Sequence, residues 1–166
     1  WWNVPLYVTA HGLGTPAMPC GDDVLDIEFD FVTHHLHFRL GLGPEASKPL
    51  RPQTVADFYK EYLACLDSLG VAVKLNPMQV EVPHPIRFDL DTVHKSYDAE
   101  YAQRFWRVLA QSEAVFRQFC GDFLGKVSPV HFFWGSFDLA VTRFSGRPAP
   151  AREGADNIQR EAYSHE

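Results

Sequence analysis

Two short runs of sequence decide the fold: LDIEFDF at residues 25–31 and LHFRL at residues 36–40. In each run apolar side chains alternate with charged or polar ones. A period of two residues is typical of a β-strand with one buried face and one solvated face. A tight turn at Thr33-His34 between the runs predicts a β-hairpin.

The register of this hairpin follows from both of its faces. Glu28 would lie beside Arg39 and Asp30 beside His37, and opposite charges on neighbouring strands favour that pairing. On the other face the same register predicts three apolar pairs: Phe31 with Leu36, Phe29 with Phe38, and Ile27 with Leu40.

Two amphipathic helices follow the hairpin. Apolar residues recur at helical spacing from Val55 to Leu69, with Thr54 placed to cap the start and Gly70 just past the end. A second apolar stripe at the same spacing predicts a helix from Asp98 to about residue 123.

The other segments are shorter or broken. Residues 12–22, rich in Gly and Pro, are expected to form a loop. Residues 129–144 are aromatic and β-favouring but too long for one strand, so we expect a break or bulge at Gly135-Ser136. Further strands are predicted at residues 4–10, 71–75 and 78–82.

These elements predict an α+β fold, in which a curved, mainly antiparallel sheet carries two amphipathic helices on one face. Residues 1–146 would form a single domain core, and residues 147–166 a loop and the start of a further segment. Trp1 to Thr9 can be aligned with Trp134 to Thr142 at a constant offset. This match is as compatible with a two-repeat architecture as with convergent strand composition.

Composition excludes several classes of function. The net charge of −6 and the lack of clustered Lys and Arg argue against nucleic-acid binding. No apolar run has membrane-spanning length, which predicts no membrane association. Cys20, Cys65 and Cys120 are too few and too widely spaced for a disulfide framework or a zinc pair, and a reducing cytoplasm is the simplest compartment.

The aromatic segment after residue 129 holds the first candidate site. A bulge at Gly135-Ser136 would bring His131 and Asp138 to one sheet face, where Arg143 would join them. An imidazole, a carboxylate and a guanidinium together suit acid–base chemistry or the binding of an anion. The competing interpretation is a hydrogen-bonded core histidine with Asp138 and Arg143 paired structurally.

Further residues are predicted to complete a pocket between sheet and helices. Aromatic side chains line many ligand pockets, although they more often fill cores. The expected apolar walls are Trp134, Phe133 and Trp106. His94 and Tyr97, in the connector before the second helix, would add polar groups. Tyr163 and His165 would either form a lid or begin a further strand.

A divalent metal ion is the alternative for the same connector. Asp89, Asp91 and His94 lie within ligand reach of one another along the chain. The simpler interpretation is that the two carboxylates shape turns and that Asp98 caps the second helix. We therefore predict no metal site, and no motif identifies a cofactor or an oligomeric state.

Three stretches carry a family resemblance: WWNVPLY (1–7), SPVHFFWGSFDLAVTRFSG (128–146) and EAYSHE (161–166). They resemble family 5996 of the bacterial domains of unknown function. The resemblance spans the whole chain and implies that members extend beyond both of its ends. It implies no activity.

The leading functional hypothesis is a small-molecule-binding domain that uses acid–base residues in an aromatic-lined pocket. One alternative is a non-catalytic interaction module that uses exposed aromatics such as Trp1, Trp2 and Tyr163. The other is a metal-dependent hydrolase that uses His94, Asp91 and His131.

Overall fold

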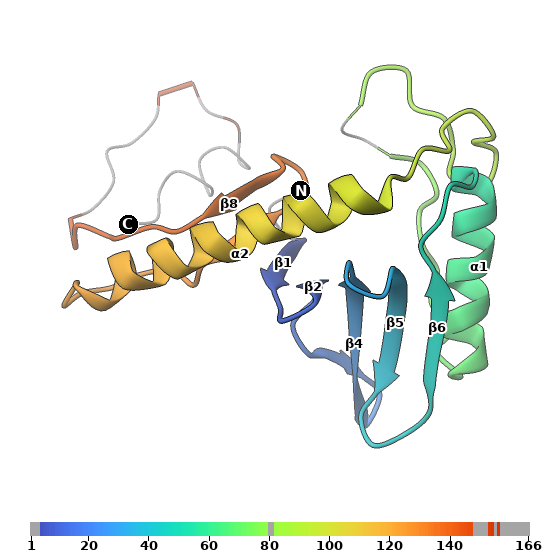
Figure 1. The fold of residues 1–166 in the computed structure, drawn as a ribbon, viewed down its shortest axis with the longest axis horizontal. Coiled ribbons are helices and arrows are strands. Elements are labelled where there is room, and N and C mark those ends of the chain that lie inside the picture. The colour runs from blue at the N-terminus through green and yellow to red at the C-terminus, as the bar shows by residue number, and fades with distance from the viewer. Residues whose placement is uncertain (1–3, 80–81, 148–152, 155, 157–166) are drawn as a thin grey trace.

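The protein has an α+β fold, as the sequence predicts (Figure 1). The computed structural model describes residues 4–79, 82–147, 153–154 and 156. Within them, eight strands form one sheet. The elements in chain order are β1 (Pro5–Val8), β2 (Gly12–Gly14), β3 (Met18–Cys20), β4 (Asp23–Asp30), β5 (His35–Leu40), β6 (Glu45–Pro49), α1 (Val55–Ser68), α2 (Ala99–Gly121), β7 (His131–Phe133) and β8 (Asp138–Ala140).

The sheet is antiparallel throughout its described part. Its strand order is β6-β5-β4-β2-β1-β7-β8, and β3 pairs with β4 beside this path. The order brings the N-terminal strand β1 next to β7, more than a hundred residues away in the sequence. The chain between them supplies the central hairpin and both helices (Figure 1).

The predicted hairpin is β4–β5, but the predicted register is wrong by two residues. Phe29 pairs with Leu36 instead of Phe38, and Ile27 pairs with Phe38. A shift of two residues leaves every side chain on its original face. The division into an apolar and a polar face therefore holds.

The loop between the two strands explains the shift. The carboxylate of Asp30 accepts hydrogen bonds from the backbone N–H groups of Val32 and Thr33, both at 2.8 Å. His34 follows with a φ of 56°, a left-handed conformation that ends the loop. This side-chain-to-backbone turn is longer than the two-residue turn that we predicted.

Both charge pairs used for the prediction survive as diagonal contacts: Arg39 donates to Glu28 at 2.7 Å, and His37 lies 3.8 Å from Asp30. Arg39 also donates at 3.0 Å to Asp26, which is directly opposite it. Thr9 also donates to Glu28, at 2.6 Å. Burial alone would raise the pKa of Glu28, but hydrogen bonds from Thr9 and Arg39 lower it below its usual value. This polar cluster therefore stays charged on the sheet face opposite the main core.

Both helices begin where the sequence predicts. The Thr54 hydroxyl accepts a hydrogen bond from the Asp57 N–H at 3.0 Å and caps α1, and Gly70 follows the helix at a φ of 72°. Asp98 caps α2 by accepting from the Tyr101 N–H at 3.0 Å. The second helix ends at Gly121, two residues earlier than predicted.

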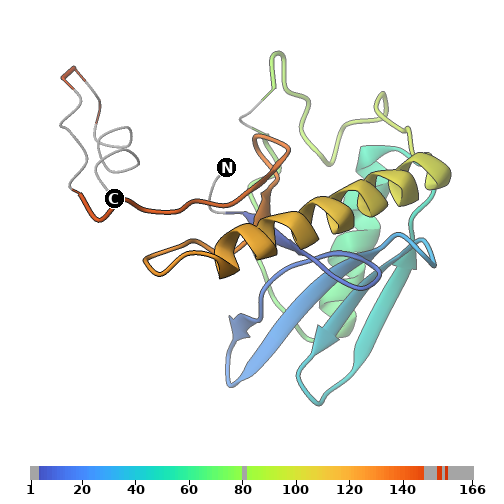
Figure 2. The same ribbon diagram turned by 60° about the vertical axis from the view of Figure 1, so that its left-hand side comes forward.

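The two helices pack on the same face of the sheet over different strands. They lie at a steep angle to each other (Figures 1 and 2). The α1 cluster of buried residues comprises Leu25, Ile27, Leu36, Phe38, Leu50, Leu66, Leu69 and Val71. The α2 cluster comprises Leu6, Leu13, Leu109 and Phe132.

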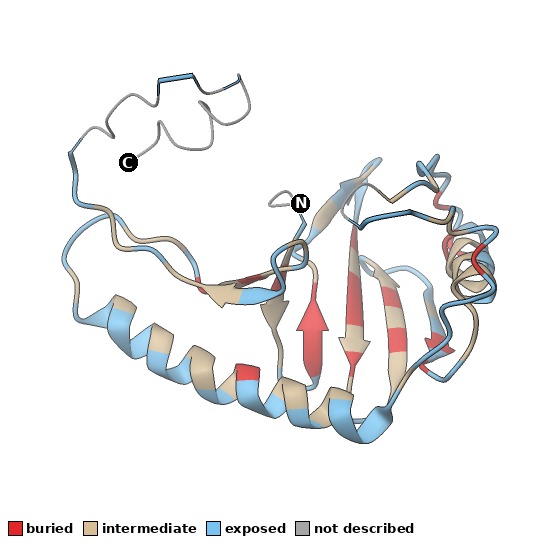
Figure 3. Ribbon diagram, turned by 90° about the horizontal axis from the view of Figure 1, so that it is seen from above, coloured by how far each residue is buried: buried red, intermediate tan, exposed pale blue. Residues whose placement is uncertain are grey.

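The α2 helix is bound to the sheet by a narrow contact. Leu109 is its one buried residue, and the rest of the helix is intermediate or exposed (Figure 3). Among the described residues, no helix combines the length and the apolar character needed to cross a bilayer.

Three other predicted segments differ from the structure. Residues 71–75 and the described part of 78–82 form no strand. Val71 packs into the α1 cluster, and its N–H donates to the Leu66 carbonyl at 2.9 Å. Residues 12–22, predicted as a loop, contain β2 and β3. A side chain at Gly12 would meet the Phe29 carbonyl oxygen at 1.7 Å, so glycine permits β2 to lie close to β4.

The break predicted at Gly135-Ser136 is a reverse turn and not a bulge. Residues 134–137 turn the chain through a hairpin that pairs β7 with β8. Phe137 closes this turn at a φ of 58°, and its N–H donates to the Phe133 carbonyl at 2.8 Å.

A buried ion pair joins the sheet to α1, and it allows a stability prediction. The Lys48 side chain is 4% exposed, and its ammonium lies 2.9 Å from Glu61 and 3.6 Å from the ring centroid of Phe58. We expect Glu61→Ala to lower the free energy of unfolding by about 1–2 kcal/mol, since it leaves a buried cation unpaired. Lys48→Met should cost less, because Glu61 keeps its 3.0 Å contact with Arg51. Urea unfolding of both variants tests this order, and a larger loss in Lys48→Met would contradict it.

Candidate functional site

A cavity of about 720 Å³ lies between the sheet and the two helices. Its walls come from every layer of the fold: the sheet, the start of α1, the connector before α2, the first turns of α2 and the β7–β8 turn. Most of its lining is apolar. The residues are Leu13, Phe29, Phe31, Leu50, Arg51, Gln53, Val55, Phe58, Val93, His94, Lys95, Ser96, Tyr97, Asp98, Tyr101, Ala102, Phe105, Phe132, Trp134 and Phe137.

The cavity lies between the α1 cluster and the α2 cluster, which are two separate groups of buried residues. Phe31 packs against both clusters and forms part of the cavity wall between them. Phe105 closes the α2 side, with its ring stacked on that of Phe137 at a centroid distance of 5.2 Å. Residues from the first turns of both helices, Val55 and Phe58 of α1 and Tyr101 and Ala102 of α2, form part of the cavity wall.

The connector before α2 carries the polar groups at the rim of the cavity. The carbonyls of Asp91 and His94 accept hydrogen bonds from the first two N–H groups of α1, Ala56 at 2.9 Å and Val55 at 3.0 Å. These are donors that a helix start leaves unpaired, so the connector is held against α1 by its own backbone.

Asp91 and His94 form a close pair on this connector. Asp91 is 2% exposed, and its carboxylate lies 2.7 Å from His94 Nδ1. The other carboxylate oxygen accepts from the N–H groups of Val93 and His94, both at 3.0 Å. The His94 N–H bond is the largest of the effects that lower the pKa of Asp91, and they outweigh its burial. The His94 side chain itself is 65% exposed at the cavity rim.

Tyr97 links the connector to the β4–β5 hairpin. Its hydroxyl lies 2.9 Å from His34 Nδ1, and burial raises the pKa of the phenol. The ring forms part of the cavity wall. The contact therefore joins the β4–β5 loop, through His34, to the connector before α2.

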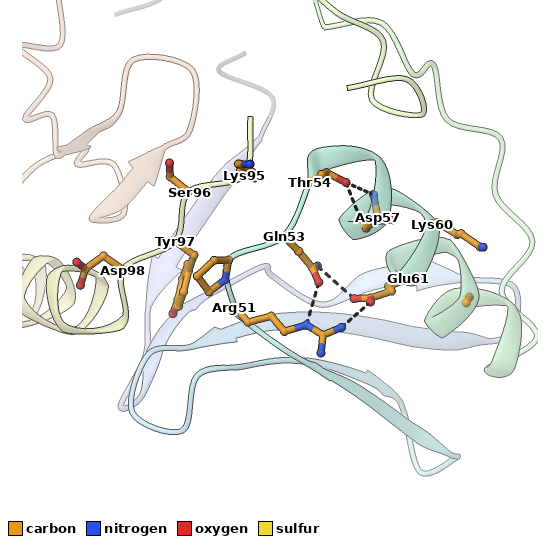
Figure 4. Close-up of a pocket in the computed structure, with 12 residues that line it drawn as sticks. Arg51, Gln53, Thr54, Asp57, Lys60, Glu61, Lys95, Ser96, Tyr97 and Asp98 are labelled. Carbon is orange, nitrogen blue, oxygen red and sulfur yellow. Dashed lines mark hydrogen bonds and ion pairs between the residues drawn. The ribbon is translucent and has the colours of Figure 1, made fainter. Parts of the chain in front are cut away.

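A second, polar pocket of about 1150 Å³ shares Tyr97 and the neighbouring residues of the connector with the aromatic cavity (Figure 4). Arg51 and Gln53 reach into it and donate to Glu61 at 3.0 and 3.2 Å. Lys95 stands at its upper edge in this view. The central charges of this pocket are therefore paired with one another.

Some of the ligand-binding residues predicted from the sequence line the aromatic cavity, and others do not. Trp134, Tyr97 and His94 line the aromatic cavity. Trp106 donates its indole N–H to the Thr9 carbonyl at 3.1 Å and is not part of the cavity wall. Phe133 lies on the opposite sheet face, since its neighbour Phe132 is fully buried in the α2 cluster.

His131 and Asp138 lie on the same sheet face, because Asp138 pairs with Phe133 and His131 is two residues along β7, but Arg143 does not join them. His131 shares the outer sheet face with Tyr7, and its Nδ1 lies 2.8 Å from the Pro129 carbonyl. Asp138 is exposed on β8. Arg143 lies against α2, where its guanidinium bonds to the Phe119 carbonyl and stacks over the ring at 3.5 Å. The reverse turn at residues 134–137 therefore places His131 and Asp138 on one face, as the predicted bulge would have done, but on the outer face and without Arg143.

The proposed lid residues Tyr163 and His165, and the aromatics Trp1 and Trp2, lie outside the described residues. The resemblance seen in the sequence has an independent counterpart. Residues 1–166 match the model of a family described as a family of unknown function, DUF5996. The chain belongs to this family. No curated protein and no solved structure matches this chain.

The residues that the metal alternative requires are not gathered at one point of the structure. No three His, Cys, Asp or Glu side chains gather closely enough to hold an ion in the part of the chain that the structure describes. His131 lies on the face opposite His94, and Asp89 is paired with Arg87 at 2.8 Å. Asp91 shapes a turn and Asp98 caps α2, as the simpler interpretation of the connector predicts.

Sequence reasoning missed most of the cavity of this DUF5996 domain. Phe29 and Phe58 follow ordinary core periodicity, and nothing in that spacing distinguishes a cavity wall from a packed core. A signal for the Asp91–His94 pair was present, since the two residues are three apart in a polar connector. The sequence analysis groups them only as possible metal ligands and otherwise assigns Asp91 to a turn and His94 to the pocket.

Proposed function

We propose that this domain binds a small, flat and mainly apolar molecule in the aromatic cavity. The observation that carries the proposal is the cavity's position between two separate core clusters, with rings on all sides. Its volume of about 720 Å³ falls within the range of about 300–1,000 Å³ that is usual for ligand pockets.

The rings at the mouth supply the driving force for binding. Tyr101, Trp134 and Phe137 are 66%, 53% and 56% exposed, although all three line the cavity. A ligand that covers them removes apolar surface from water, which is worth about 25 cal/mol per Å². Aromatic faces favour a flat partner, because rings stack at an offset or meet edge to face.

Fluorescence titration tests the proposal directly. Saturable binding of anilinonaphthalene sulfonate at one molecule per domain is expected, with a micromolar dissociation constant. Trp134 lines the cavity and Trp106 does not, so Trp134→Phe should remove the binding-induced change in tryptophan emission. Trp106→Phe is the control and should retain the change. Absence of saturable binding would overturn the proposal.

A non-catalytic interaction module is the second candidate. Tyr101, Val108 and Val115 recur every seven residues on α2 and are 66%, 59% and 63% exposed, so they form an apolar stripe along one side of the helix. This function would leave dye binding unaffected by changes in the cavity. The Trp134→Phe experiment therefore separates the two candidates.

We place the protein in the cytoplasm. Cys20, Cys65 and Cys120 are all free thiols, and burial raises the pKa of the Cys65 thiol. Unpaired, poorly reactive thiols suit a reducing compartment.

A further inference from the structure

We infer that His94 is a general base for the molecule bound in the aromatic cavity and that Asp91 is its positioning residue. This inference rests on the proposed function, because it requires a ligand to occupy the cavity. The substrate would be a flat, mainly apolar molecule with a proton on carbon that a neighbouring electron-withdrawing group makes acidic.

The Asp91 contact fixes the protonation pattern of the imidazole. An ionised carboxylate can only accept hydrogen bonds, so His94 Nδ1 must carry the proton in the 2.7 Å contact. The lone pair is then on Nε2, the nitrogen that faces away from Asp91. A base needs this nitrogen free, and no hydrogen bond occupies it among the described residues.

The carboxylate is itself held in place. Two backbone N–H groups, those of Val93 and His94, fix one of its oxygens, and its 2% exposure keeps water from competing for the other. When Nε2 takes up a proton, the imidazolium lies beside a buried negative charge. A histidine oriented and stabilised in this way by a buried carboxylate is the arrangement found in hydrolytic triads.

Other histidines of the domain lack this combination. His131 and His35 place Nδ1 against backbone carbonyls, at 2.8 Å in both cases, and a carbonyl provides no countercharge. His37 lies 3.8 Å from Asp30 but on the outer sheet face, away from the cavity. His94 alone among these four contacts a carboxylate and lines the aromatic cavity.

The step is a simple proton transfer. The C–H bond of the substrate breaks, its electron pair stays on the substrate, and a new N–H bond forms at His94 Nε2. The negative charge that develops is delocalised onto the electron-withdrawing group. The proton then leaves the imidazolium for water or returns to the product, which restores the neutral base.

The base-catalysed opening of 5-nitrobenzisoxazole tests this role. A base removes the ring C–H proton, the N–O bond breaks, and the coloured cyanonitrophenolate forms without any co-reactant. General-base catalysis typically contributes a factor of about 10²–10⁴. We therefore expect His94→Ala to lower kcat by about 100-fold or more. Added imidazole should restore part of the rate, which a purely structural histidine would not allow.

Two further variants complete the test. Asp91→Asn keeps the size of the side chain and an oxygen for the backbone N–H groups, but it removes the negative charge beside His94. It should therefore lower kcat by at least about tenfold and leave KM unchanged. His131→Ala is the matched control and should leave kcat unchanged, because His131 lies on the opposite sheet face.

Binding measured by displacement of anilinonaphthalene sulfonate separates the two possible failures. If 5-nitrobenzisoxazole binds in the cavity but is turned over equally by His94→Ala and the unaltered domain, the assignment of His94 is wrong and the proposed binding function stands. If neither compound binds, the binding function fails and the role of His94 fails with it.

Discussion

Replacing Ala102 with phenylalanine is expected to weaken ligand binding by about 100-fold or more, equivalent to about 2.7 kcal/mol. Ala102 lies in the first turns of α2 and its small side chain forms part of the cavity wall. A phenyl ring at this position would occupy the space that a flat ligand needs. Isothermal titration calorimetry with anilinonaphthalene sulfonate measures the loss.

Ala114→Phe is the matched control for this prediction. It makes the same substitution on the same helix, at an exposed position outside the cavity lining. Both variants carry the small cost of phenylalanine in a helix, roughly 0.5 kcal/mol, so a difference in affinity between them reports on the cavity. Equal affinities in the two variants would show that the dye binds elsewhere.

The secondary structure was predictable wherever one local signal decided it. Thr54 and Asp98 cap the two helices as their positions before apolar stripes indicate, and the alternation in residues 25–31 gives a strand. The register of β4–β5 was not predictable from charge pairing. Arg39 reaches diagonally to Glu28, so the same ion pair is compatible with two registers.

The site was harder to predict, because it depends on how distant segments meet. The proposed convergence of His131, Asp138 and Arg143 required the chain to continue through Gly135-Ser136 with a bulge. A reverse turn at the same glycine sends β8 back along β7 and carries Arg143 to the end of α2. Glycine followed by serine is compatible with either conformation, so the local sequence does not select between them.

For a related reason, the aromatic cavity could not be predicted from the spacing of apolar residues in the sequence. Phe31, Phe58 and Phe105 each occupy a position at which the apolar pattern calls for a buried ring. Whether three such rings touch one another or surround a space depends on the angle between α1 and α2, which no single segment of the sequence encodes. The polar rim was easier to find, since Asp91 and His94 are close along the chain.

Phe132→Ala is expected to cause the largest loss of stability, about 3–5 kcal/mol. Phe132 is fully buried, and its ring meets those of Phe105 and Phe137 edge to face at centroid distances of 5.9 and 5.1 Å. It also pairs with Leu6 across β1 and β7, so its loss affects the contact that joins the two ends of the described chain.

The loss should appear in thermal unfolding as a decrease in Tm of roughly 6–20 °C, since each kcal/mol shifts a domain of this size by about 2–4 °C. Phe119→Ala provides the comparison. Its ring is 42% exposed and its main contact is the guanidinium of Arg143, so about 1 kcal/mol is expected. If the two variants were equally stable, the α2 cluster would contribute far less to folding than its burial implies. The separation of the core into two clusters, on which the cavity depends, would then need to be reconsidered.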